Sequence, residues 1–384
     1  MGVLRRKWTT RSGEKREAWI AKYADGAGVR RIATFERKKD ADAYFAEVQT
    51  ALRAGTHTPA STSPSMREAA ANWLAYVELE GRERSTLAQY RQHVELHINP
   101  RIGDEKLASL TTPRMNAYRD DLLAGLSRAL AKKVLTSTKS ILKDAQRRGH
   151  VAQNVARDVR IGVDKRSKRK LKVGVDIPTP QEIGRIVSAV KGKWQPILVT
   201  DIFTGLRSSE LRGLRWSDVD LKRGLVHVRQ RADRYNAIGN PKSEAGERTI
   251  PLGPFVLNML REWKLKCPAS ALGLVFPTSR GRIIRHENIV RYAWWPTQIA
   301  AGVVSASGEP RYPGLHAVRH FYASWLINRR ADGGLELPAK VVQERLGHAS
   351  ITITMDTYGH LFPDGDDGDE LATAERALTS PHAV

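Results

Sequence analysis

The fold of the C-terminal half depends most on the segment Leu315-His316-Ala317-Val318-Arg319-His320-Phe321. We predict a helix here, on which His316, Arg319 and His320 share one face through their i, i+3 and i+4 spacing. Two histidines at this spacing can in principle share a metal ion, but no third ligand lies nearby in the sequence, so a metal site has little support. Taken alone, His316 fits a core or capping histidine equally well.

Three other stretches carry polar residues in suggestive places. Thr204-Gly205-Leu206-Arg207-Ser208-Ser209-Glu210-Leu211 predicts a helix end, a tight glycine turn and a second helix that begins at Arg207. Asn240-Pro241-Lys242-Ser243 predicts a hairpin loop that carries a lysine, and Leu346-Gly347-His348-Ala349-Ser350 precedes Tyr358. Each signal is weak by itself: Arg207 fits a surface ion pair, Lys242 a loop lysine and Tyr358 a half-buried aromatic.

The chain as a whole is strongly basic. It has 384 residues, with 63 Lys and Arg against 41 Asp and Glu, and a formal net charge of +22. This balance indicates a polyanionic partner, of which nucleic acid is the commonest. The single cysteine, Cys267, excludes a disulfide framework and a four-cysteine zinc site and fits a reducing cytosol. We expect no signal peptide and no membrane span. The sequence contains neither the phosphate-loop motif G-x-x-x-x-G-K-[ST] nor the dinucleotide-binding motif G-x-G-x-x-G. Use of ATP or of a dinucleotide is therefore not expected.

Composition and turn signals divide the chain into five parts. Residues 1–58 predict a small α+β unit, with β-type runs at 19–23 and 31–35 followed by a helix. Residues 65–160 predict a helical domain that opens with the capping box Ser65-Met66-Arg67-Glu68. The remaining parts are a basic linker at 161–177, a mixed domain at 178–362 and an acidic tail at 363–384.

The mixed domain at 178–362 opens with a second capping box, Thr179-Pro180-Gln181-Glu182, and has strand candidates at 225–228 and 248–252. The linker before it is expected to contact DNA phosphates, although a solvated, exposed segment is the plainer interpretation. Its basic residues are Lys165, Arg166, Lys168, Arg169, Lys170 and Lys172.

The order and spacing of these stretches resemble the tyrosine recombinase family, also called phage-type integrases. TGLRSSEL, HAVRHFYASWL and ERLGHAS followed by MDTYGHLF look like that family's signature boxes. The resemblance is strong over residues 178–362 and moderate over 65–160. It implies a multidomain fold: a small α+β arm-binding domain, an all-α SAM-like core-binding domain, and a mainly helical α+β catalytic domain with a small β-sheet. The segment at 328–338 is longer than the usual family connection and is expected to be a surface insertion.

The resemblance also implies a metal-independent and ATP-independent transfer of DNA strands through a 3′-phosphotyrosyl intermediate, without a cofactor. Tyr358 is then the nucleophile, Lys242 the acid for the leaving 5′-oxygen and His316 the acid and base on the tyrosine side. Arginine forks suit the charge of a phosphorane. The implied catalytic residues are Arg207, Lys242, His316, Arg319, His348 and Tyr358, supported by Glu210 and His320.

The function that the resemblance implies is site-specific recombination by the integrase of a temperate phage or integrative element, in the bacterial cytoplasm. Four protomers are expected on two double-stranded DNA attachment sites, with a DNA-bending factor and an excisionase as possible partners. Two alternatives stay open from the residues. One is a catalytically inactive DNA-binding regulator on the same scaffold, and the other is an enzyme that relaxes DNA like a type IB topoisomerase.

Overall fold

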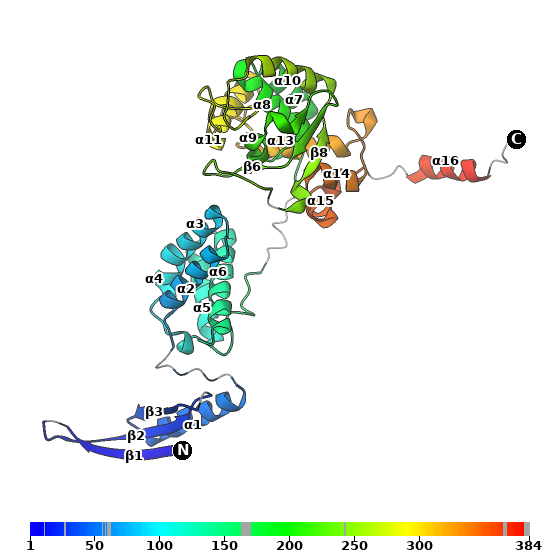
Figure 1. The fold of residues 1–384 in the computed structure, drawn as a ribbon. Helices are drawn as coiled ribbons and strands as arrows, with labels where there is room; N and C mark the ends of the chain where they lie inside the picture. The colour runs from blue at the N-terminus through cyan, green and yellow to red at the C-terminus, as the bar shows by residue number, and fades with distance from the viewer. Residues whose placement is uncertain are drawn as a thin grey trace. The chain divides into compact units, whose positions relative to one another are not determined.

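The computed structural model describes residues 1–10, 12–26, 28–55, 57, 59, 63–162, 170–241, 243–363 and 367–379 (Figure 1). The chain divides into two compact units, Met1–Lys165 and Arg166–Val384. The boundary falls inside the segment that the sequence predicts as a linker. No helix among the described residues has both the length and the apolar character that a membrane crossing needs.

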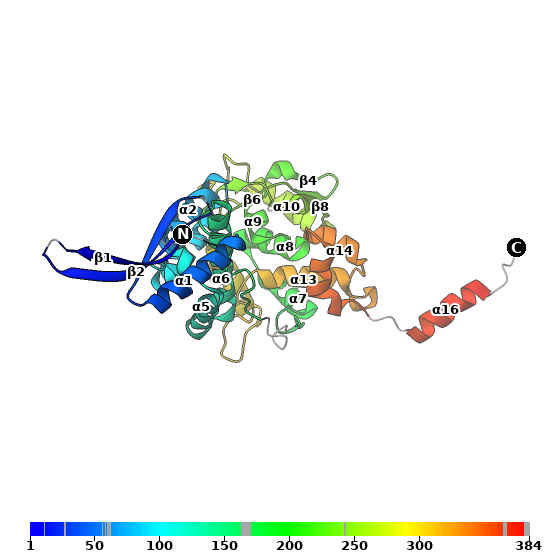
Figure 2. The ribbon, with the colours of Figure 1, turned by 90° about the horizontal axis from the view of Figure 1, so that it is seen from below.

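The first unit begins with an antiparallel sheet of order β1-β2-β3, built from β1 (Gly2–Thr9), β2 (Lys15–Ala24) and β3 (Arg30–Phe35). The β1–β2 hairpin extends beyond β3 (Figures 1 and 2), because β3 pairs with Trp19–Ala24 alone. Helix α1 (Lys38–Arg53) buries Ala41 and Val48. The sequence predicts β2, β3 and α1 but misses β1. Beyond Val3 the residues of β1 are exposed, so they lack the alternation that marks a half-buried strand.

The rest of the first unit is helical, as predicted. Ser65 and Glu68 form the expected capping box at the start of the first helix. Further helices of this part of the unit begin at Arg84, Thr112 and Arg128. Its helices are α2 (Met66–Leu79), α3 (Arg84–His93), α4 (Asn99–Ile102), α5 (Thr112–Gly125) and α6 (Arg128–Arg147). They enclose a core of buried side chains that includes Trp73, Ile98, Met115, Tyr118, Val134 and Ile141.

The second unit packs helices around two short sheets, one of order β4-β5-β8 and one a β6–β7 hairpin. The predicted strands at 225–228 and 248–252 are neighbours in the first sheet, with Val226 opposite Ile250. The strands are β4 (Val219–Asp220), β5 (Leu225–Val228), β6 (Arg231–Ala232), β7 (Ile238–Gly239) and β8 (Arg248–Pro251). The helices are α7 (Pro180–Ala189), α8 (Gln195–Thr204), α9 (Ser208–Gly213), α10 (Pro254–Lys266), α11 (His286–Ile289), α12 (Trp295–Ala300), α13 (His316–Ile327), α14 (Ala339–Leu346), α15 (Ile351–Tyr358) and α16 (Asp367–Thr379).

Two of these helices, α8 and α13, form the centre of the second unit. Nearly every residue of α8 is buried, and α13 is buried on most of its circumference. Helices that are apolar on all sides belong in the middle of a core. The expected insertion at 328–338 is exposed at its start. It then returns to α13, where the Leu335 and Leu337 amides donate to the carbonyl oxygens of Trp325 and Leu326 at 3.0 and 2.8 Å.

Candidate active site

The turn between α8 and α9 places Arg207. Helix α8 ends at Thr204, and Gly205 follows in the left-handed region with φ 56° and ψ 29°. A Cβ at Gly205 would lie 2.3 Å from Cδ1 of Tyr322 on α13, so glycine is needed for space as well as for conformation. Arg207 then stands immediately before α9, which confirms the predicted helix, turn and helix.

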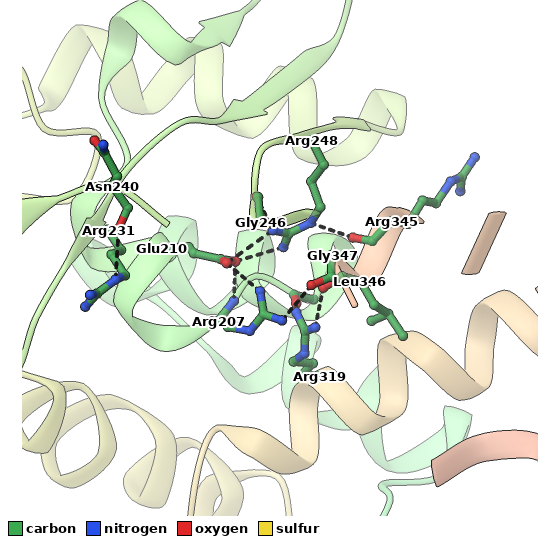
Figure 3. A network of polar contacts seen from close by, with 11 residues as sticks. Arg207, Glu210, Arg231, Asn240, Gly246, Arg248, Arg319, Arg345, Leu346 and Gly347 are labelled. Atoms are coloured by element: carbon green, nitrogen blue, oxygen red, sulfur yellow. Dashed lines mark hydrogen bonds and ion pairs between the residues drawn. The ribbon is translucent and has the colours of Figure 1, made fainter. Parts of the chain in front are cut away.

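Glu210, in the first turn of α9, holds two guanidinium groups (Figure 3). Its Oε1 accepts from Nη1 of Arg207 at 2.8 Å, and both carboxylate oxygens accept from Arg248, at 3.1 and 2.8 Å. The Glu210 side chain is 3% exposed and that of Arg248 is 5% exposed. Burial raises the pKa of Glu210, but the hydrogen bonds and charge of Arg248, together with Arg207, lower it to about 2. Glu210 is therefore a fixed anion.

Three arginines converge on the C-terminal end of α14 (Figure 3). Arg248 donates from Nε to the carbonyl oxygen of Arg345 at 2.8 Å, and Arg207 donates from Nη2 to that of Gly347 at 2.8 Å. Between them, Arg319 donates from Nη2 to the carbonyl oxygen of Leu346. The last carbonyls of a helix lack partners within the helix and carry its negative dipole end, so they attract cations. The end of α14 thus gathers three guanidinium groups from three other elements.

Arg319 lies deepest in this cluster. It is 3% exposed, and its Nη1 donates to the carbonyl oxygen of Gly205 at 2.6 Å. Burial, followed by the charges of Arg207 and Arg248, lowers the pKa of Arg319 to about 10, so it stays charged at neutral pH. Arg207 is 36% exposed. These contacts use two of the five N–H donors of each of the two guanidiniums, Arg207 and Arg319.

The histidines and the tyrosine lie beside the arginines. His316 and His320, one turn apart on α13, meet edge to face with ring centroids 4.5 Å apart. The hydroxyl oxygen of Tyr358, at the end of α15, lies 2.7 Å from Nδ1 of His320. The His348 ring is parallel to that of Tyr358 at 6.3 Å, and its Nδ1 lies 2.9 Å from Oγ1 of Thr354. It is therefore His320 rather than His316 that contacts the Tyr358 hydroxyl.

Burial leaves these rings uncharged at neutral pH. It lowers the pKa of His320 and of His348 to about 4 in each case, with the charge of Arg319 acting in the same direction. The pKa of His316 is lowered for the same reasons. Burial raises the pKa of Tyr358 to about 12, against the opposing effect of Arg319. The positive charge of the site thus resides on three guanidiniums that face one carboxylate, and this surplus favours an anionic ligand.

Two polar residues of this region are missed by the sequence analysis. Arg248 is a strand residue in the sequence, and nothing in its neighbours signals that it meets Glu210 and α14. Asp201, on α8, is 1% exposed, and its Oδ2 has no hydrogen-bond partner among the described residues. Burial raises the pKa of Asp201 well above its usual value, against the charge of Arg319. A charged residue within an otherwise apolar helix is the one sequence signal that marks Asp201.

Some predicted site residues lie outside the described part of the chain. These are Lys242 and, in the linker, Lys165, Arg166, Lys168 and Arg169. Lys170 and Lys172 are described and exposed. The β6–β7 hairpin that precedes Lys242 is tied to α9 by Arg212, whose Nη2 donates to the Asp233 carbonyl at 3.0 Å. In the part of the chain that is described, no three His, Cys, Asp or Glu side chains gather as metal ligands.

Comparison with known proteins assigns this arrangement to a family. Residues 179–364 match the model described as the phage integrase family. The chain belongs to this family of tyrosine recombinases. This recombinase is 26% identical over 371 residues to a "Tyrosine recombinase XerC-like" protein of Caldanaerobacter subterraneus subsp. tengcongensis, covering 90% of the chain and 91% of that protein.

Two solved structures share the fold of the recombinase. The Tn1549 transposon integrase in complex with a circular intermediate DNA superposes with a TM-score of 0.63 at 20% identity, covering 82% of this chain and 100% of that one. A lambda integrase tetramer bound to a Holliday junction superposes with a TM-score of 0.56 at 18% identity, covering 90% and 96%. These similarities support the predicted multidomain architecture.

Proposed function

We propose that this recombinase is the integrase of a temperate phage or integrative element, acting on DNA in the bacterial cytoplasm. It cuts one strand at each attachment site, holds the 3′-phosphate on Tyr358 and passes that end to the partner duplex. With accessory factors the same chemistry runs as excision. The observation that carries the proposal is the buried hydroxyl of Tyr358 beside a cluster of three arginines at the end of α14. Figure 3 shows the three arginines.

Metal-free phosphoryl transfer needs positive charge against the extra negative charge of the phosphorane. Arg207 and Arg319 supply it, since each guanidinium keeps N–H donors beyond its contacts within the protein. A phenolate is both a nucleophile and a tolerable leaving group, so the phosphotyrosyl bond is reversible and conserves bond energy without ATP. Tyr358 is therefore the covalent carrier in this proposal.

The remaining polar groups divide the work around the phosphate. When Nδ1 of neutral His348 accepts a hydrogen bond from the Thr354 hydroxyl, the ring proton is on Nε2. The Nε2–H group then donates a hydrogen bond to a phosphate oxygen. His316 completes the polar face of α13 toward the phosphate. Lys242 gives a proton to the leaving 5′-oxygen. Glu210 holds Arg207 and Arg248 in place.

The other parts of the chain serve DNA binding. Residues 65–160 and 178–362 clamp the core of the attachment site, the linker at 161–177 follows the phosphates, and residues 1–58 bind separate arm sites. Four protomers act on two duplexes, with a DNA-bending factor and an excisionase as partners. This assembly is supported by the lambda integrase tetramer on a Holliday junction, by the Tn1549 integrase on DNA and by the net charge of +22.

An XerC-like recombinase is the second candidate. The relative from Caldanaerobacter, which bears that description, is matched over 90% of this chain. The two candidates differ in what residues 1–58 contribute. In the integrase proposal residues 1–58 bind DNA arms outside the core site, whereas in the alternative they do not.

The proposal is tested with nicked suicide duplexes tiled across the DNA that flanks the gene, in EDTA and without nucleotide. We expect the wild-type protein to form a covalent adduct with one of them and Tyr358→Phe to bind that duplex without forming any. The ring is kept in this variant, so packing changes little while the nucleophilic oxygen is removed. An adduct with Tyr358→Phe would assign the nucleophile elsewhere. A need for magnesium would contradict the mechanism, and binding without cleavage by the wild type would indicate a regulator. Relaxation of plasmids without any site would indicate a topoisomerase-like enzyme.

A further inference from the structure

The hydroxyl of Tyr358 is held by His320, a residue to which the resemblance gives only a supporting place. The Tyr358 oxygen and Nδ1 of His320 are 2.7 Å apart, and the two rings meet edge to face at 5.7 Å. Tyr358 is 2% exposed, so water does not compete freely for this contact. Among the described residues, the hydrogen-bond partner of the nucleophilic oxygen is therefore this imidazole.

The direction of this hydrogen bond follows from the two protonation states. Burial raises the pKa of Tyr358 to about 12, so the phenol is protonated at neutral pH. Burial, His316 and Arg319 lower the pKa of His320 to about 4, so its ring is neutral. In the tautomer of neutral His320 that carries its proton on Nε2, the protonated phenol donates this hydrogen bond and Nδ1 accepts it. In that tautomer the ring nitrogen nearest to the nucleophile is an unprotonated base.

Resting on the proposed function, we propose that His320 is the catalytic base that takes the proton of Tyr358 during strand cleavage. As the Tyr358 oxygen bonds to phosphorus, its proton passes to Nδ1 of His320. The bond from phosphorus to the 5′-oxygen breaks, and that oxygen takes a proton from Lys242. On rejoining, the incoming 5′-hydroxyl gives its proton to Lys242, and the His320 imidazolium returns its proton to the departing phenolate.

Asp176 lies in the last turn of the linker at 161–177. A hydrogen bond joins the start of this turn to the residues that follow Tyr358. Oδ2 of Asp176 accepts from the Lys172 amide at 3.0 Å, which closes a tight loop. The carbonyl oxygen of Leu171, just before that loop, accepts from Nε2 of His360 at 2.8 Å, two residues beyond Tyr358. The carboxylate of Asp176 acts on His320 in the direction that favours the imidazolium.

The groups around His320 explain why the base works only on bound DNA. His316 and Arg319 on its own helix oppose the imidazolium, Asp176 on the linker favours it, and the Tyr358 phenol donates to it. A phosphate bound by Arg207 and Arg319 brings negative charge that offsets the opposing cations. Proton transfer is therefore unfavourable in the empty site and becomes easier when the scissile phosphate is in place.

His316, the acid and base expected from the resemblance, is less well placed for this step. Its ring meets the edge of His320 at 4.5 Å, whereas the Tyr358 hydroxyl is hydrogen-bonded to His320. His316 therefore remains available to the phosphate.

The test measures single-turnover adduct formation on the suicide duplex from pH 6 to 10 with His320→Asn. The asparagine oxygen accepts a hydrogen bond near the position of Nδ1 but cannot take a proton. We expect a loss of about 10²–10⁴-fold at pH 7. The remaining rate should rise about tenfold per pH unit as phenolate forms. A substrate with sulfur in place of the leaving 5′-oxygen should not restore the rate of His320→Asn. The same substrate should restore the rate of Lys242→Ala, because a sulfur leaving group needs no acid.

His227→Asn is the matched control, because His227 also contacts a hydroxyl through Nδ1, at 2.9 Å from Oγ1 of Thr249, and is half-buried on β5. DNA binding and urea unfolding report on folding. If His320→Asn is unstable, the test is instead whether added imidazole restores adduct formation by His320→Ala. Wild-type rates in the variant, or a loss that neither pH nor imidazole reverses, would overturn the role of His320. Failure of the wild type to form an adduct would instead overturn the proposed function, and this inference with it.

Discussion

At the scale of single residues, Glu210 sets the charge balance of the arginine cluster. Its carboxylate is buried and contacts Arg207 and Arg248, with its pKa lowered to about 2. Removing one member of such a buried group leaves the others uncompensated, typically at a cost of about 3–5 kcal/mol. Glu210 therefore links the stability of the fold to the geometry of the guanidiniums that we propose to bind phosphate.

We predict that Glu210→Gln lowers the free energy of unfolding at pH 7 by about 3–5 kcal/mol and also slows cleavage. Because the pKa of Glu210 is lowered from its ordinary value of 4.5, its stabilisation is present above that value and is lost as pH falls toward 2. The difference between variant and wild type should therefore shrink below pH 4.5 in urea unfolding measured at several pH values.

Glu182→Gln is the matched control for that prediction. Glu182 is also a buried carboxylate, and it accepts from Nη1 of Arg311 and from the hydroxyl of Tyr312, both at 2.8 Å. It touches none of the three clustered arginines. Its replacement should cost stability without slowing cleavage by folded protein. Equal effects of the two variants on cleavage would mean that Glu210 serves the fold alone.

At the scale of elements, the end of α14 organises the site. Gly347 ends this helix in the left-handed region, with φ 63° and ψ 47°, and its carbonyl holds Arg207. A Cβ at Gly347 would lie 2.8 Å from the carbonyl oxygen of Ala245 and 2.9 Å from Nη1 of Arg248. The helix end can therefore approach Arg248 this closely only because residue 347 lacks a side chain.

We predict that Gly347→Ala slows cleavage strongly, because the added methyl group displaces Arg248 or the end of α14. Gly333→Ala is the control, since Gly333 is also left-handed, with φ 80°, and has open space around its Cβ position. Both variants bear a backbone cost of about 1 kcal/mol. Adduct formation on the suicide duplex and urea unfolding are measured for each. Parallel losses in both variants would show that backbone strain, and not the close contact, is responsible.

At the scale of the whole molecule, residues 1–58 form a basic segment of sheet and helix within the first compact unit. Its sheet exposes Arg5, Arg6 and Lys7 on β1. A DNA-binding unit attached through a linker raises binding through effective concentration without changing the chemistry. The residues that we propose to be catalytic all lie beyond residue 200, so DNA-arm binding and cleavage are expected to be separable.

We predict that removing residues 1–60 leaves cleavage of a core site intact and impairs recombination of full attachment sites. For every DNA phosphate that the truncated protein no longer binds, the salt dependence of DNA binding should flatten by about one unit of slope. The truncated and intact proteins are compared on DNA with and without flanking arms. Equal recombination of full sites by both proteins would refute the arm-binding role and favour the XerC-like alternative.

The family and the local structure of this recombinase follow from the sequence alone. The capping boxes at Ser65 and Thr179, the glycine turn before Arg207 and the helix that carries His316, Arg319 and His320 depend on neighbours a few residues apart. Such features are readable because helix periodicity and capping are local. The signature boxes of the family then indicate which polar residues are expected to form one site.

Which of these groups touch is set by the tertiary structure. Arg207 reaches Gly347 across 140 positions of sequence, and Arg248 meets Glu210 across 38. The pairing of Tyr358 with His320 rather than His316, and the missed strand β1, likewise depend on partners that no local pattern names. Burial and contact at such separations arise only when the core packs, and they set both the hydrogen bonds and the pKa values of the site.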